Sequence, residues 1–211
     1  ATGRNLGTIK PIFDFYGFLP DFWILNNGAI IADRDGKTLF IKLIPRKTAL
    51  AVLRYLQSIN DDGSGVSLTD RKVCLLSEKG TSTQKACDGG TITADQLESL
   101  DNIVQLHRRN LDLKHIKDLC KDIEERFSEV SAYANLWNGD IVARGVDKAV
   151  AVKWLKEHFP QIEKIRCIGD SVNDLGMVRA YQGAVPDVAD PEIKKEATQI
   201  VKSVAEFLEN F

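Results

Sequence analysis

The sequence predicts an α/β protein with a parallel-sheet core and an inserted α+β segment. Both ends of the 211-residue chain alternate short apolar runs with amphipathic stretches, whereas the middle mixes strands with longer helical segments. Alternating strands and helices are typical of a parallel sheet covered by helices. We therefore expect residues 1–44 and 139–211 to form the core and residues 45–138 to form a separate cap, with a ligand cleft between the two bodies.

The first part of the core begins with a helix and a hairpin. Apolar residues recur at helical spacing at Leu6, Ile9 and Ile12, which predicts a helix within residues 5–18. Residues 22–25 are a short apolar strand. Two further apolar runs, 29–32 and 38–41, flank the turn residues Asp35-Gly36 and predict a β-hairpin.

The remaining elements follow from the same periodicities. In the cap, we expect helices at 46–58, 94–106 and 113–127, a loop at 60–65, a Gly/Ser/Thr-rich stretch at 78–90, and strands at 73–76, 130–136 and 140–143. In the second part of the core, we expect a helix at 147–158, a strand at 165–168, a helix at 175–180, an apolar run at 183–185, and helices at 191–197 and 202–208.

The bulk composition excludes several partners. The formal net charge of −2 favours neither nucleic acid nor a membrane surface, and no apolar stretch is long enough for a membrane span. Cys120 and Cys167 lie in apolar patterns and are interpreted as reduced core residues of a cytoplasmic protein. The three histidines are scattered, which argues against zinc.

The loop Gly169-Asp170-Ser171-Val172-Asn173-Asp174 carries the strongest chemical signal. It joins the predicted strand at 165–168 to a helix, so its carboxylates lie where open α/β sheets bind ligands. Asp170 and Asp174 suit a hard, hydrated cation such as Mg²⁺. A surface turn with an Asn/Asp helix cap is the alternative.

Two more residues complete a possible phosphate site. Thr2-Gly3 precedes a helix and offers a hydroxyl and a backbone N–H to an anion. Lys148 near the start of the 147–158 helix offers a compact positive charge. Together with a carboxylate-bound Mg²⁺, these groups would neutralise and orient a phosphoryl group.

The order of these motifs resembles the haloacid dehalogenase-like (HAD) superfamily, and most closely its subfamily IIB of Cof-like and sucrose-phosphate-phosphatase-like hydrolases. The resemblance rests on four segments and on the tail from Gly183 to Lys194. The segments are Ala1-Thr2-Gly3-Arg4, Asn26-Asn27-Gly28-Ala29, Gly145-Val146-Asp147-Lys148 and the Gly169–Asp174 loop, whose Asp170 lies 22 positions after Lys148.

The resemblance implies a Rossmann-like core with an α/β cap and Mg²⁺-dependent hydrolysis of a small phosphorylated metabolite, such as a sugar phosphate. Thr2 would bind the transferring phosphoryl group and Lys148 would stabilise its charge. Asp170 would ligate Mg²⁺, and Asp174 would hold the metal's waters or the lysine. Asn173 would contact the phosphate, and Gly3 and Arg4 would shape the pocket.

One expected motif is absent from the sequence. The family attacks phosphorus with the first Asp of an Asp-x-Asp-Gly-Thr motif on a strand that precedes the Thr-Gly-Arg loop. Asp33-Arg34-Asp35-Gly36 imitates that motif, but it lies inside the predicted hairpin, whose turn explains it. We therefore expect this chain to be the downstream part of a longer protein, with an aspartyl-phosphate formed on an Asp outside it, and to be inactive alone.

Two other functions compete with a phosphatase. A non-catalytic phosphometabolite-binding protein would keep the anion site without turnover. A nucleotide-binding Rossmann module is disfavoured because the chain has no GxGxxG or GxxxxGK[ST] pattern. We expect substrate specificity to come from cap residues around 78–83 or 135–137, where Trp137 could stack on a sugar or simply pack.

Overall fold

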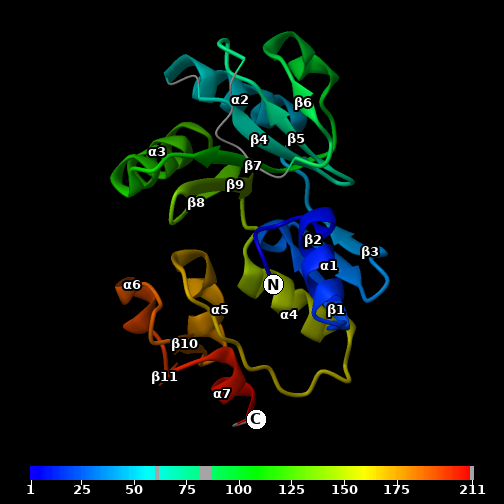
Figure 1. The fold of residues 1–211 in the computed structure, drawn as a ribbon, viewed down its shortest axis with the longest axis vertical. Helices are drawn as coiled ribbons and strands as arrows, with labels where there is room; N and C mark the ends of the chain where they lie inside the picture. The colour runs from blue at the N-terminus through cyan, green and yellow to red at the C-terminus, as the bar shows by residue number, and fades with distance from the viewer. Residues whose placement is uncertain (60–61, 81–86, 210–211) are drawn as a thin grey trace. The chain divides into compact units, whose positions relative to one another are not determined.

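A computed structural model describes residues 1–59, 62–80 and 87–209 of the chain. The chain divides into two compact units, Ala1–Val146 (unit 1) and Asp147–Phe211 (unit 2). Figure 1 shows the elements of both units.

Unit 1 begins with a helix and a small antiparallel sheet. Helix α1 (Leu6–Phe15) starts after Asn5, whose side-chain oxygen accepts the Thr8 N–H at 3.1 Å. Strands β1 (Phe22–Leu25), β2 (Ile30–Asp33) and β3 (Thr38–Ile41) pair in the order β1-β2-β3. The predicted hairpin is confirmed, since Asp33 Oδ1 accepts the N–H groups of Asp35 and Lys37 in the turn between β2 and β3.

A six-stranded sheet with helices on one face forms the rest of unit 1. Its strand order is β6-β5-β4-β7-β9-β8. Helices α2 (Arg46–Ile59) and α3 (Leu113–Arg126) pack against it (Figure 1). The strands are β4 (Ser64–Leu68), β5 (Lys72–Leu75), β6 (Thr91–Ile92), β7 (Ile103–Arg109), β8 (Val130–Asn135) and β9 (Asn138–Ala143).

The two faces of this sheet differ in chemistry because side chains alternate along each strand. Val66, Leu106 and Ile141 lie opposite one another on β4, β7 and β9 and are fully buried in the apolar core. The other face carries a set of polar residues that we call the polar row. Its members are Lys72, Ser67, Gln105, His107 and Asp140.

Unit 2 holds short elements around a few apolar residues. Helix α4 (Lys148–His158) begins after Asp147, whose Oδ1 accepts the Val150 N–H at 2.7 Å. The short strands β10 (Ala184–Pro186) and β11 (Gln199–Val201) pair in parallel. The 3₁₀ turn η3 (Val172–Asp174) leads into α5 (Leu175–Ala180), and α6 (Pro191–Lys194) and α7 (Val204–Glu209) complete the unit.

Three predicted elements differ from the structure. The helix predicted at 94–106 is wrong: a 3₁₀ helix, η2 (Ala94–Ser99), is followed by the strand β7, which is buried along nearly its whole length. The loop predicted at 60–65 partly lies outside the described residues, and Ser64 and Gly65 belong to β4. The strand predicted at 165–168 is reduced to one parallel bridge between Ile168 and Ala184.

The fold is a mixed α/β fold with mostly antiparallel pairing. In the described ranges, parallel pairing is limited to β5–β6, β10–β11 and the Ile168–Ala184 bridge, so the predicted parallel core is not shown. The predicted boundary after residue 138 falls inside β9, which pairs with β7 and β8. The division into core and cap stays a prediction.

The cysteines fall into two classes. Cys120 and Cys167 are buried free thiols, as predicted, and burial raises the pKa of Cys120 to about 12 and that of Cys167 to about 11. Cys74 and Cys87 form a disulfide that the sequence did not lead us to expect. None of the helices in the described part of the chain is both long and apolar enough to cross a membrane.

Candidate functional site

Backbone hydrogen bonds hold the Thr2–Arg4 loop against the end of β1. The Thr2 N–H donates to the Ile24 carbonyl at 2.8 Å, and the Thr2 carbonyl accepts the Asn27 N–H at 3.0 Å. The Thr2 hydroxyl oxygen accepts the Arg4 N–H at 3.2 Å. The N–H of Thr2 is therefore used inside the protein, and its hydroxyl proton is the donor that this residue can offer to an anion.

The Asn26-Asn27-Gly28 segment ties this loop to β9. All three residues have positive φ, at 50°, 57° and 103°, a conformation that Asn and Gly adopt most readily. Asn27 Nδ2 donates to Asp140 Oδ2 at 3.0 Å. A side chain at Gly3 would place its Cβ 3.2 Å from each of these two atoms, so a glycine permits the close approach.

Asp140, His107 and Ser67 form a buried hydrogen-bonded chain across β9, β7 and β4. His107 Nδ1 lies 3.0 Å from Asp140 Oδ1, and His107 Nε2 lies 2.9 Å from Ser67 Oγ. The three residues are 4%, 8% and 1% exposed, so water competes little for these hydrogen bonds.

The pKa shifts of His107 and Asp140 indicate the charges of these two side chains. Burial lowers the pKa of His107, although the bond to Asp140 opposes this effect. Burial raises the pKa of Asp140, but hydrogen bonds from His107 and Asn27 outweigh it and hold the pKa below its usual value. A neutral imidazole next to an ionised carboxylate is therefore the state near neutral pH.

Thr2, Gly3 and Arg4 share one cavity with every member of the polar row except Gln105. This cavity of unit 1 has a volume of about 420 Å³. Besides the Thr2–Arg4 loop, it is lined by Asn5 and Thr8, by Ser67, Lys72, His107 and Asp140 of the sheet, and by Asn135, Leu136 and Asn138 of the β8–β9 turn. The cavity is therefore polar on nearly every side.

In unit 2, Lys148 and Asp174 form a buried ion pair. Lys148 Nζ lies 2.6 Å from Asp174 Oδ1, and the two side chains are only 6% and 7% exposed. Asp174 Oδ2 accepts the Asp170 N–H at 3.3 Å. The contact expected between Asp174 and the lysine is thus present, whereas the roles of these residues in a reaction stay predictions.

The loop from Gly169 to Asp174 is closely packed. A Cβ on Gly169 would lie 2.3 Å from the Cβ of Asp174, which real atoms do not tolerate, so this position requires glycine. Asn173 is buried, and its Oδ1 accepts the Ser171 hydroxyl at 2.6 Å. The sequence Gly-Asp-Ser-Val-Asn-Asp therefore folds into one compact loop that carries two carboxylates.

The donor set of this loop fits a hard cation. Asp170 is exposed, and its carboxylate makes no hydrogen bond or ion pair within residues 1–59, 62–80 and 87–209. Both carboxylate oxygens of Asp174 already have partners in the protein, so Asp174 suits the role of holding the lysine or the metal's waters. The carboxylate of Asp170 suits the role of a metal ligand. No group of three or more His, Cys, Asp or Glu that could hold a metal is present among the described residues.

The predicted site residues thus fall into two groups. Thr2, Gly3 and Arg4 lie together in unit 1, and Lys148, Asp170, Asn173 and Asp174 lie in unit 2. The structure describes each group within its own unit, and the joining of the two groups into one site stays a prediction.

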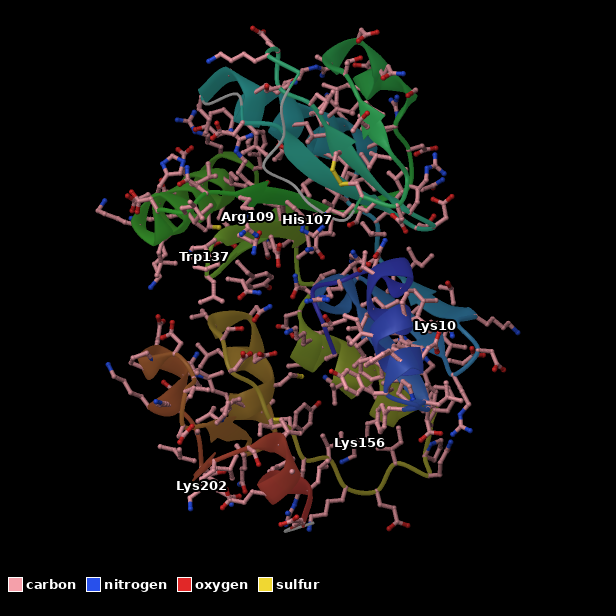
Figure 2. The ribbon with its side chains drawn as sticks, viewed as in Figure 1. Lys10, His107, Arg109, Trp137, Lys156 and Lys202 are labelled. Atoms are coloured by element: carbon pink, nitrogen blue, oxygen red, sulfur yellow. A yellow bond between two sulfur atoms is a disulfide. The ribbon has the colours of Figure 1, made fainter. Side chains whose placement is uncertain are left out.

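The predicted specificity region is described only in part. Residues 81–83 lie outside the described residues. Trp137 is half exposed and does not line the cavity, and the Arg109 guanidinium carbon lies 5.6 Å from its ring centroid (Figure 2). This arrangement is typical of a cation–π contact.

Sequence reasoning missed the polar row. The run Val104-Gln105-Leu106-His107 alternates apolar and polar residues, which is the period of a strand and could have indicated that Gln105 and His107 share a face. Ser67, Lys72 and Asp140 carry no comparable local signal, because only strand pairing brings them beside His107.

The fold is a mixed α/β fold, with a polar cavity in unit 1 and a loop that carries two carboxylates in unit 2. The chain belongs to the haloacid dehalogenase-like hydrolase family, since its residues 1–207 match the model of that family. The predicted membership is confirmed.

Known proteins are similar to this chain in sequence or in fold. A phosphoglycolate phosphatase of Pyrobaculum aerophilum is 31% identical over 72% of this chain and 68% of its own length. A haloacid dehalogenase-like hydrolase from B. subtilis has a similar fold, with a TM-score of 0.78 at 20% identity over 94% of this chain and 80% of its own. A HAD subclass IIB sugar phosphatase has a TM-score of 0.77 at 16% identity over 100% of this chain and 84% of its own.

Proposed function

We propose that this protein is a Mg²⁺-dependent phosphomonoester hydrolase that acts on a sugar phosphate or a similar small phosphorylated metabolite. The buried Lys148–Asp174 pair beside the exposed carboxylate of Asp170 is the observation that carries the proposal. A buried lysine that is already paired can stabilise added negative charge without first reorganising water. The family and the sugar phosphatase and phosphoglycolate phosphatase among its relatives support the substrate class.

Each predicted residue has a task in this proposal. Thr2 donates its hydroxyl proton to a phosphoryl oxygen, and Gly3 lets the loop approach Asn27 and Asp140 closely. Lys148 offsets the charge of the phosphoryl group, and Asp174 holds Lys148 in place. Asp170 would hold Mg²⁺, which when bound supplies charge neutralisation at the phosphoryl oxygens.

Arg4 and Asn173 have supporting tasks in the proposal. Arg4 lines the cavity beside Thr2 and carries a second positive charge. Asn173 contacts the phosphate in this proposal. The Rossmann-like core, the cap over residues 45–138 and a cytoplasmic location are parts of the same proposal. Asp33 and Asp35 have no catalytic task, since Asp33 closes the β2–β3 turn.

Phosphate release from a panel of sugar phosphates tests this function. We expect turnover by the protein as its gene encodes it, dependent on Mg²⁺ and lost with EDTA, and a fall of at least about 100-fold in kcat/KM for Asp170→Asn. The matched control is Asp187→Asn, an aspartate of the same unit that follows β10. Mg²⁺-dependent binding of a sugar phosphate without turnover would instead favour the phosphometabolite-binding protein.

A further inference from the structure

All members of the polar row except Gln105 line the same cavity as the Thr2–Arg4 loop, so a ligand whose phosphoryl group contacts Thr2 extends toward Ser67, Lys72 and His107. The part of a substrate that departs in phosphomonoester hydrolysis is its leaving group. The chemistry of the polar row therefore decides which leaving groups this cavity accepts, and this step depends on the function proposed above.

Asp140 fixes which nitrogen of His107 carries the proton. An ionised carboxylate only accepts hydrogen bonds, so Nδ1 must donate to Asp140. Gln105 Nε2 lies 3.1 Å from the same Nδ1. A half-turn of the Gln105 amide exchanges its nitrogen and oxygen, so that the amide oxygen faces the Nδ1–H group. Because the imidazole is neutral, Nε2 is then a bare acceptor.

The bare Nε2 in turn fixes the Ser67 hydroxyl. Ser67 has one proton, and it must donate that proton to His107 Nε2 across 2.9 Å. What Ser67 Oγ can still offer to the cavity is its acceptor capacity. A ligand atom that reaches Ser67 must therefore be a hydrogen-bond donor.

Lys72 supplies the opposite polarity next to Ser67. The two residues are directly opposite on β5 and β4. Lys72 is partly buried, and burial lowers the pKa of its ammonium group, although the negative charges of Asp140 and Asp88 oppose this effect. Because this lysine already faces two negative charges, the position favours a neutral acceptor, such as a hydroxyl oxygen, over a second anion.

We propose that Ser67, Lys72, His107 and Asp140 form a subsite for two neighbouring hydroxyl groups of a polyhydroxylated leaving group. One hydroxyl donates to Ser67 Oγ, and the next accepts from Lys72 Nζ. Asn135 and Asn138 also line the cavity and offer amides that both donate and accept, and Leu136 is the one large apolar side chain among the described residues of the lining. A purely aliphatic leaving group finds few matching contacts in this cavity.

Three phosphate monoesters of one chain length test the proposal. Sorbitol 6-phosphate carries hydroxyl groups, 6-phosphogluconate adds a carboxylate to them, and hexyl phosphate has neither. We expect kcat/KM for sorbitol 6-phosphate to exceed that for hexyl phosphate by at least about 100-fold, because a site built for hydroxyls rejects an analogue that lacks them. Equal rates, or a preference of about tenfold or more for 6-phosphogluconate, would overturn the proposal.

Variants then assign the preference to the polar row. Ser67→Ala and Lys72→Met should each lower kcat/KM for sorbitol 6-phosphate by about tenfold, as expected for one hydrogen bond, and change that for hexyl phosphate by less than about twofold. Lys156→Met is the matched control, since Lys156 is exposed on α4 (Figure 2). Equal losses on both substrates would contradict the proposal, and Lys72→Met keeps the test informative if Ser67→Ala does not fold.

Calorimetric binding of the same three compounds separates the two proposals. Tighter binding of sorbitol 6-phosphate without turnover of any compound would sink the hydrolase function and leave the hydroxyl subsite standing. Turnover of all three compounds with no difference in affinity would support the hydrolase function and overturn the hydroxyl subsite.

Discussion

The Gly169–Asp174 loop and the polar row are both polar clusters with buried members, but the chain builds them in different ways. The loop places Asp170, Asn173 and Asp174 within six consecutive residues, and Lys148 pairs with it from the first turn of α4. The polar row takes one or two residues from each of four strands, and only the pairing of those strands brings them together. A short segment specifies the first cluster, whereas sheet register specifies the second.

Of the losses of stability that test this contrast, we expect the largest at the Lys148–Asp174 pair. Lys148→Met leaves the Asp174 carboxylate buried without its cation, which we expect to cost about 3–5 kcal/mol of stability. Denaturant unfolding of unit 2, followed through the fluorescence of Trp154, measures this loss. The double variant Lys148→Met/Asp174→Asn should recover part of it.

An exposed pair of equal length provides the control. Lys114 and Asp118 on α3 also lie 2.6 Å apart, but their side chains are 82% and 64% exposed. Lys114→Met should cost far less stability than Lys148→Met does, because solvent screens exposed pairs. Similar losses for the two lysine variants would show that burial does not set the strength of the Lys148–Asp174 pair.

The next effect tests whether the loop geometry itself is required. Gly169→Ala forces a Cβ to within 2.3 Å of the Asp174 Cβ, so Asp174 must move. We expect a loss of about 1–3 kcal/mol in stability and of at least about 100-fold in kcat/KM, since a displacement of about 1 Å can cost that much. Thermal unfolding and phosphate release measure the two losses.

Gly176→Ala is the matched control for this substitution. Gly176 lies in α5 of the same unit, and a Cβ there would have its nearest neighbour, Ala149 Cβ, at 3.5 Å, an ordinary contact. We expect unchanged activity and slightly higher stability, because alanine favours the helix. If Gly169→Ala behaves like Gly176→Ala, the close packing of the loop has no functional consequence.

The same contrast explains what could be predicted from the sequence. The β2–β3 hairpin, α2, α3 and α4 follow from Asp-Gly turn chemistry and from helical periodicity, which act over a few residues. The Lys148–Asp174 contact followed from a motif whose order the family shares. β7 was missed although Val104–His107 has the period of a strand, because that alternation spans only four residues. Ser67, Lys72 and Asp140 were missed because sequence distance carries no information about register.

The smallest effect should come from titrating the polar row. The pKa of His107 is lowered by its burial, so the folded protein binds a proton at this site more weakly than the unfolded chain does. Stability is then fully present above the ordinary histidine pKa of 6.5 and is lost as pH falls from there toward the folded value. Asp140, whose pKa is also lowered, adds a second loss below its ordinary value of 3.8.

Thermal unfolding between pH 7.5 and pH 5 measures the histidine contribution, in which each unit of separation between the two pKa values is worth about 1.4 kcal/mol. His107→Gln retains an amide that can donate to Asp140 and has no proton to gain, so its midpoint should fall less over this range than that of the wild type. His115→Gln is the control, because His115 is only partly buried and lies on α3, outside the polar row. A wild-type midpoint that rises as the pH falls would mean that His107 is charged in the folded protein, and Ser67 would then lose its fixed role as an acceptor.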